Sequence, residues 1–381
     1  MNILPAALTL ALAPAWAIRP ETDRLILQGL DAAYGFDFER AASLFSKADQ
    51  AEPDHPAGPF FLASLKWLEF SQNADIPGSL KALEPQFNRL LEETFERSRR
   101  MREKSPEDPE AFFYLGGAYG MRGRWQLLKR QWIRAASSGY KGYRQLKKAV
   151  ELDPSFYDAY LGLGMYDYYA AKLPAVIKLA ALLVARGDKE RGLSHVLLAI
   201  EKGHYSVTEA KLFLVGIYTG YEKQPQKALQ IIQELRRQKP ENLFFTFMEV
   251  VARIDSQDWM GAIAYGEELL PKAREASYTR PQLSLIELYL GEAYLGAKDY
   301  EKAVETFTRC IEQAPEPRKA TVTYCYLRRA QALDLLGRRE EALRDYRLAE
   351  ERPDFFDSQD KARKGLKREA THDEVLRQLL E

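Results

Sequence analysis

Residues 291–315 have the spacing of two antiparallel α-helices joined by a short turn, and this pattern limits the fold more than any other feature of the chain. Gly291 and Tyr294 fall on one face of the first helix, and Ala303 and Phe307 fall on one face of the second. The two small residues allow the helix backbones to approach, while the two aromatic rings fill the space between turns. Proline at position 315 ends the second helix.

The same pattern recurs along the chain. An early copy has its small, aromatic and proline residues at the same offsets: Gly29, Ala41, Phe45, Ala48 and Pro53. A middle copy repeats the offsets with aliphatic residues: Gly216, Ala228, Ile232, Leu235 and Pro240. These positions resemble the tetratricopeptide repeat of roughly 34 residues. The resemblance implies an all-α, right-handed superhelical solenoid of eight helix pairs.

The copies divide the sequence into an array and a cap. Residues 18–353 are expected to form the helical array, with insertions near residues 124–140 and 170–187, in two adjacent repeats. Insertions at matching places in repeat proteins often lie on the binding face. Residues 354–381 are charged with a sparse apolar stripe, which predicts one C-terminal capping helix with a polar outer face.

Residues 1–17 read as a signal peptide. An apolar run from Ile3 to Trp16 ends in the Ala-Trp-Ala pattern of a signal-peptidase site, and Arg19 begins the polar sequence. No lysine or arginine precedes the run. The sequence therefore predicts an exported protein of bacterial type, periplasmic or extracellular; a short uncleaved anchor and a misplaced start are the alternatives. No later segment of the sequence is long and apolar enough to predict a transmembrane span.

Residues 164–193 carry a second, fainter resemblance. Gly164-Met-Tyr-Asp-Tyr-Tyr, then Lys172-Leu-Pro, then Arg186-Gly-Asp-Lys-Glu-Arg-Gly-Leu is similar to the insert of the eukaryotic tetratricopeptide-39 and inclusion-body-clearance proteins. This resemblance would imply an adaptor linked to lipid or aggregate handling.

No motif indicates catalysis. The sequence has no phosphate-binding loop, nucleophile elbow or zinc-protease motif. Its four histidines are scattered, and two cysteines cannot form a four-thiolate zinc site. We therefore expect no enzyme, no cofactor and no metal. Cys310 and Cys325 allow two interpretations: a disulfide between neighbouring helices, or two small core residues in place of alanine.

The charge is balanced overall, with 55 basic and 55 acidic residues, but not locally. Residues 97–148 hold fourteen Lys or Arg and four Asp or Glu, including Arg124, Arg130 and Arg134, interleaved with Trp125 and Trp132. Such a region suits an anionic partner: an acidic protein segment, the headgroups of an envelope lipid, or an anionic glycan. The alternative function is therefore a peripheral envelope protein that binds anionic lipid or glycan through residues 97–148. The alternative is a solvated flank of two long helices with buried tryptophans. Nothing in the sequence resembles a nucleic-acid-reading module.

In the tetratricopeptide family the first helix of each pair lines a concave groove, which binds a protein or peptide. The resemblance places ten residues on that face. Six are the candidate partner-binding residues: Phe113, Phe156, Tyr166, Phe213, Ile217 and Tyr221. The other four are Leu288, Glu292, Tyr324 and Gln331. The leading prediction is thus a non-catalytic scaffold or adaptor in the cell envelope that binds a protein or peptide in this groove. The groove could instead be filled by the inserted residues 173–185.

Overall fold

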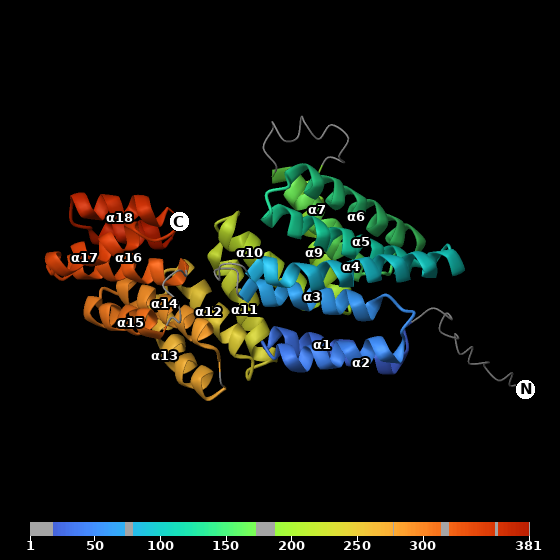
Figure 1. Ribbon diagram of the computed structural model, residues 1–381, viewed down its shortest axis with the longest axis horizontal. Coiled ribbons are helices and arrows are strands. Elements are labelled where there is room, and N and C mark those ends of the chain that lie inside the picture. The colour runs from blue at the N-terminus through green and yellow to red at the C-terminus, as the bar shows by residue number, and fades with distance from the viewer. Residues whose placement is uncertain are drawn as a thin grey trace, which may run out of the picture. The chain divides into compact units, whose positions relative to one another are not determined.

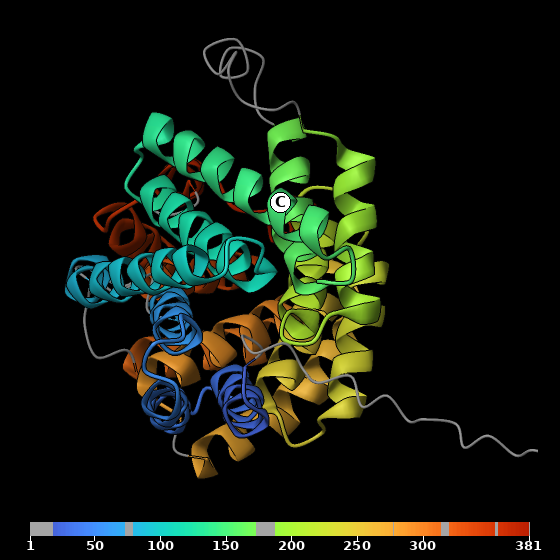
Figure 2. The ribbon, with the colours of Figure 1, turned by 90° about the vertical axis from the view of Figure 1, so that its right-hand side faces the viewer.

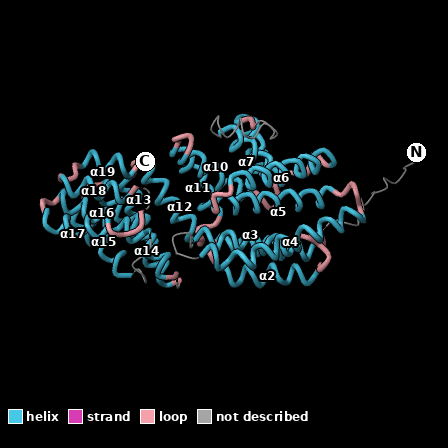
Figure 3. Tube along the Cα trace, turned by 45° about the horizontal axis from the view of Figure 1, so that its top comes forward, coloured by secondary structure: helices cyan, strands magenta, loops and turns pink. Residues whose placement is uncertain are grey.

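The computed structural model describes residues 18–72, 79–172, 187–276, 278–313, 320–354 and 357–380. Within these ranges the chain forms eighteen α-helices and no β-strand, as Figure 3 shows by its helices and short connecting loops. The predicted all-α class is confirmed. Among the described helices, none is long and apolar enough to cross a membrane. The predicted signal peptide, residues 1–17, lies outside the described residues, as do residues 173–186.

The helices follow one another as antiparallel pairs (Figures 1 and 2). The bounds are α1 (Pro20–Tyr34), α2 (Phe38–Ala51), α3 (Ala57–Gln72), α4 (Ser79–Lys104), α5 (Pro109–Leu128), α6 (Trp132–Leu152), α7 (Asp158–Lys172), α9 (Lys189–Lys202), α10 (Val207–Gly220), α11 (Pro225–Gln238), α12 (Leu243–Asp255), α13 (Trp259–Glu275), α14 (Arg280–Gly296), α15 (Tyr300–Gln313), α16 (Ala320–Leu335), α17 (Arg339–Glu350), α18 (Ser358–Lys367) and α19 (His372–Leu379).

The chain divides into two compact units. One contains residues up to 30, 39–63 and 89–198, and therefore the α5–α6 hairpin; the other contains residues 31–38, 64–88 and 199 onward, and therefore the helices from α10 to α19. Each unit is described below by itself.

The hallmark glycines of the repeat act as the sequence predicts. A Cβ atom added to Gly291 would lie 2.5 Å from a ring atom of Phe307, and one added to Gly29 would lie 2.4 Å from a ring atom of Phe45. Both rings are fully buried. Only a hydrogen atom at these positions lets the aromatic ring pack directly on the facing helix, so the spacing of glycine and aromatic determines how closely each pair packs.

The structure corrects the prediction of an inserted segment at residues 124–140. Helix α5 continues to Leu128 and α6 begins at Trp132, so the extra residues lengthen both helices of one hairpin. Asp108 caps the start of α5, where its carboxylate accepts a hydrogen bond from the backbone N–H of Glu110 at 2.9 Å. The result is a hairpin with arms of 20 and 21 residues.

The C-terminal cap also differs from the prediction. Two short helices, α18 and α19, replace the single capping helix. Arg368, at the end of α18, has an extended backbone, and Thr371 starts α19 by accepting a hydrogen bond from the N–H of Glu374. The chain therefore breaks between them, and Val375 of α19 is fully buried in a core cluster that contains Ile286 and Leu288.

Candidate functional site

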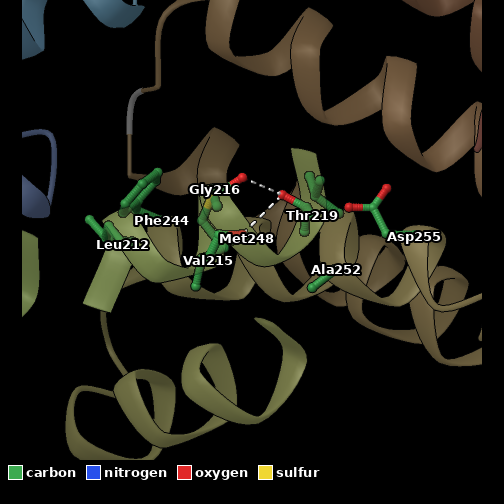
Figure 4. A pocket seen from close by; sticks show the side chains of 9 residues that line it. Leu212, Val215, Gly216, Thr219, Phe244, Met248, Ala252 and Asp255 are labelled. Carbon is green, nitrogen blue, oxygen red and sulfur yellow. Dashed lines mark hydrogen bonds between the residues drawn. The ribbon is translucent and has the colours of Figure 1, made fainter. Parts of the chain in front are cut away.

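An apolar hollow of about 190 Å³ lies between α10 and α12, the first helices of two consecutive pairs (Figure 4). Each helix contributes one stripe of side chains at helical spacing. The lining residues are Leu212, Val215, Gly216 and Thr219 from α10, and Phe244, Met248, Val251, Ala252 and Asp255 from α12. Most of this surface is apolar, and its polar groups are the hydroxyl of Thr219 and the carboxyl of Asp255.

The hollow lies beside a repeat in which the hallmark contact is missing. Among the described residues, no heavy atom lies within 4 Å of a Cβ built on Gly216. The residue sixteen places after this glycine is Ile232, where the repeats of Gly29 and Gly291 have Phe45 and Phe307. A branched aliphatic side chain does not reach the glycine. Val215 of α10 and Phe245 of α12 belong to one core cluster with Ile232 of α11, so the hollow lies beside this shared core.

The two polar residues of the hollow have different environments. The hydroxyl of Thr219 donates to the carbonyl oxygen of Val215 at 3.0 Å, so its oxygen remains available as an acceptor. Burial and the negative charge of Glu292 together raise the pKa of Asp255 to about 6, against the opposing effect of Lys223. Near neutral pH the hollow therefore offers an aliphatic and aromatic wall with one carboxylate at the end of α12.

The groove face of the last two pairs is covered by the chain itself. Arg328 of α16 is buried and donates to Glu292 of α14 at 2.9 Å, and to the carbonyl oxygen of Gln378 of α19 at 2.9 Å. Gln331 of α16 also donates to the side chain of Gln378, at 2.7 Å. Helix α19 thus occupies the inner side of α14 and α16. The alternative that residues 173–185 fill the groove concerns a segment outside the described residues. In the last two pairs, the C-terminal cap covers this face.

Three of the six candidate partner-binding residues lie on α10 or at its end. Phe213 and Ile217 are buried, and Tyr221 is 53% exposed at the C-cap. The residues of α10 that line the hollow are different ones: the buried Val215, the half-buried Leu212 and Thr219, and the exposed Gly216. None of the three candidates lines the hollow, and their role in partner binding stays a prediction.

The other three candidate partner-binding residues, Phe113, Phe156 and Tyr166, belong to the unit that contains residues 89–198. Phe113 is buried, and its ring lies 5.0 Å from the ring of Phe156. The ring of Tyr166 lies 4.6 Å from that of Tyr143, and burial raises the pKa of its hydroxyl. These aromatic residues contact other aromatic residues of the same unit, and their role in partner binding stays a prediction.

The basic residues predicted to bind an anionic partner lie on one hairpin. Arg124 is half-buried on α5, while Arg130 and Arg134 are exposed at the turn between α5 and α6 and at the start of α6. Trp125 is buried and Trp132 is 57% exposed, so the two tryptophans of this region have different environments. Within the described ranges, no group of three or more His, Cys, Asp or Glu side chains could hold a metal ion.

Comparison with known proteins agrees with the repeat seen in the structure. A family model described as tetratricopeptide repeat matches residues 290–317, the stretch with the strongest pattern. The fold is a tetratricopeptide-like helical array. Such a repeat scaffold is in general a protein-binding adaptor. The fainter resemblance of residues 164–193 to the tetratricopeptide-39 and inclusion-body-clearance proteins stays a prediction.

Several solved structures are similar to this tetratricopeptide-like array. TTC0263, a thermophilic TPR protein of Thermus thermophilus, is 16% identical with a TM-score of 0.38, over 61% of this chain and 98% of its own. Human IFIT1, in a dimer with m7Gppp-AAAA, is 14% identical with a TM-score of 0.46, over 96% and 88%. A monomeric IFIT1 mutant with Gppp-AAAA is 13% identical, with a TM-score of 0.45. No curated protein matches the chain in sequence.

The carboxyl of Asp255 is expected to make stability depend on pH. Its folded pKa of about 6 lies above the ordinary value of 3.8, so the folded chain binds this proton more tightly than the unfolded chain does. The resulting stabilisation is present below the unfolded pKa and is lost as pH rises through about 6. The shift corresponds to at most about 3 kcal/mol.

Urea denaturation of the wild type and of Asp255→Asn, followed by circular dichroism between about pH 4 and pH 7, checks this prediction. The variant is expected to gain stability relative to the wild type as pH rises. Other titrating carboxyls cancel in the difference between the two proteins. A difference that stays constant across this range would contradict the raised pKa.

Proposed function

We propose that this chain is a non-catalytic tetratricopeptide scaffold that binds a protein or peptide segment across α10 and α12, with one apolar side chain of the partner in the hollow. The observation that supports the proposal is the open space at Gly216, where the other repeats described above have a buried aromatic ring. A volume of about 190 Å³ suits one large side chain and is smaller than the usual pocket for a cofactor or drug-sized ligand. Single buried anchors of this kind dominate the affinity of many peptide interfaces.

The polar groups of the hollow favour a particular partner chemistry. The carboxylate of Asp255 and the hydroxyl oxygen of Thr219 both accept hydrogen bonds. A partner would match them with a backbone N–H, or with a lysine or arginine beside its apolar anchor. An ammonium or guanidinium group near Asp255 would also return the pKa of this carboxyl toward its ordinary value.

The proposed location is the periplasm or the extracellular space. Two observations support it. Residues 1–17 have the pattern of a signal peptide, and the structure joins Cys310 to Cys325 in a disulfide, a bond that persists mainly in oxidising compartments.

Filling the hollow is expected to abolish partner binding. In Gly216→Leu, the new side chain enters the space that the anchor would occupy and meets no described atom near its Cβ. The matched control is Gly220→Leu, on the last residue of the same helix, where a Cβ is equally unobstructed but lies outside the hollow. Both changes remove a helical glycine, so neither is expected to lower stability.

A photo-crosslinking amino acid at Met248, in residues 18–381, identifies the partner by mass spectrometry. Isothermal titration of the purified partner segment then compares the two leucine variants. We expect at least about a hundredfold weaker binding for Gly216→Leu, corresponding to the loss of one buried anchor. Equal binding by Gly216→Leu and Gly220→Leu would refute the hollow as the anchor site.

A further inference from the structure

The turn between α5 and α6 concentrates exposed apolar side chains. Leu127, Leu128, Trp132 and Ile133 lie within seven consecutive residues and are 47%, 41%, 57% and 88% exposed. Few other large hydrophobic residues of the described chain are exposed, and they are scattered singly over other helices. Isolated exposed apolar residues need no explanation, but a contiguous group of four marks an interaction surface.

The turn holds these side chains in a defined arrangement. The backbone N–H of Gln131 donates to the carbonyl oxygen of Gln126 at 2.9 Å, and that of Arg130 donates to Leu127 at 2.9 Å. Arg130 has a left-handed backbone with φ of 57°. These are the two hydrogen bonds and the left-handed residue of a Schellman motif, with arginine where glycine is usual. The apolar group therefore lies on a hydrogen-bonded turn of defined backbone geometry at the closed end of the helical hairpin.

Between Glu110 and Glu151, near its open end, the same hairpin carries charge of one sign. Residues 111–150 contain nine Lys or Arg and no Asp or Glu, although the whole chain carries 55 of each sign. Lys129, Arg130 and Arg134 are exposed among the four apolar residues. Neither Arg130 nor Arg134 has an ion-pair partner among the described residues. Arg130 and Arg134 therefore present positive charge without an ion pair beside exposed hydrocarbon.

We propose that this tip is a membrane-docking site for the surface of an anionic lipid bilayer. Tryptophan and long aliphatic side chains at a helix end partition into the boundary between headgroups and acyl chains. Basic side chains beside them meet the lipid phosphates. A nucleic acid would pair with the charges but would leave Ile133 in water, whereas the surface of an anionic bilayer matches the exposed hydrocarbon and the positive charge together.

Co-sedimentation with lipid vesicles tests the proposal. Residues 18–381 retain every described residue and omit the apolar residues 1–17, which could bind lipid themselves. The chain is expected to sediment with vesicles of phosphatidylglycerol and phosphatidylcholine, and far less with phosphatidylcholine alone. Trp132→Ser with Ile133→Ser should lower the partition coefficient by about tenfold or more, since several buried carbon atoms are lost. The control is Met260→Ser, a change of an equally exposed apolar residue on α13, which should leave binding unchanged.

A second pair of changes measures the contribution of the basic side chains to vesicle binding separately from that of the apolar side chains. Arg130→Gly with Arg134→Gln removes two charges while glycine accepts the left-handed backbone, so the turn keeps its shape. Binding to anionic vesicles should fall by about fivefold for each residue removed. Equal binding by the wild type and the Trp132→Ser, Ile133→Ser variant would overturn the proposal. So would a dimer in sedimentation-velocity runs that this variant makes monomeric without any vesicle binding, because the tip would then be a contact between two copies.

Discussion

Replacing Arg328 with methionine is expected to lower the free energy of unfolding by about 3–5 kcal/mol. The guanidinium group is only 1% exposed and donates to Glu292, to the side chain of Gln331 at 3.1 Å and to the backbone of Gln378. Burial already raises the pKa of Glu292, and Arg328 is the main group that opposes this shift. Without the arginine, a buried carboxyl loses its counter-charge and α19 loses a hydrogen bond to the array.

Urea denaturation followed by circular dichroism measures the loss, with two comparisons. The double variant Arg328→Met, Glu292→Leu removes both charges and should recover much of the stability, because no unpaired buried charge remains. Arg338→Met removes an exposed arginine paired with Glu341 and should cost less than about 1 kcal/mol. If Arg328→Met costs no more than Arg338→Met, the buried network does not hold the cap in place.

Reduction of the disulfide between Cys310 and Cys325 is expected to lower the free energy of unfolding by about 3 kcal/mol. The reason is that the unfolded chain gains conformational entropy when a loop of this length is no longer closed. The bond joins α15 to α16 across a sequence separation of 15, and both sulfur-bearing residues are fully buried. It thereby links two consecutive repeats. In an array held together by contacts between neighbours, one such link stabilises both sides of an interface.

The measurement compares denaturation with and without a phosphine reductant. Cys310→Ala with Cys325→Ala is the control, since alanine is the usual residue of the repeat at position 310 and the double variant has no bond to reduce. Its stability should not respond to the reductant. Thiol counts of the denatured wild type should rise by two on reduction. Two free thiols before reduction would show that the bond does not form.

The regular part of the fold could be predicted because its determinants are local. A glycine and an aromatic residue sixteen positions apart, as in Gly291 and Phe307, predict a closely packed helix pair, and the repeat of Gly29 and Phe45 has the same contact. The helix bounds follow from prolines and turn residues between apolar stripes. The prediction of a separate inserted element at residues 124–140 was wrong. Additional turns in both helices of a hairpin lengthen the chain by as much as an inserted element does, so sequence length alone does not distinguish them.

The candidate site was harder to predict, since it depends on distances between helices that are not adjacent in sequence. The substitution of Ile232 for an aromatic residue was visible, and it points to Gly216. The sequence does not show which side chains of α10 and α12 line the hollow between these two helices. The contact of Gln378 with Arg328 joins residues fifty positions apart, and no repeat pattern encodes a contact between a cap and a groove.

The position of α19 limits how far a bound peptide could extend along the unit that contains α10 to α19. A peptide that crosses α10 and α12 cannot continue along the inner faces of α14 and α16, because the last helix of the chain already lies there. In the binding mode proposed above, the partner segment would therefore end, or turn away, after the carboxyl of Asp255. That mode limits the partner to a short segment with a fixed end on this side.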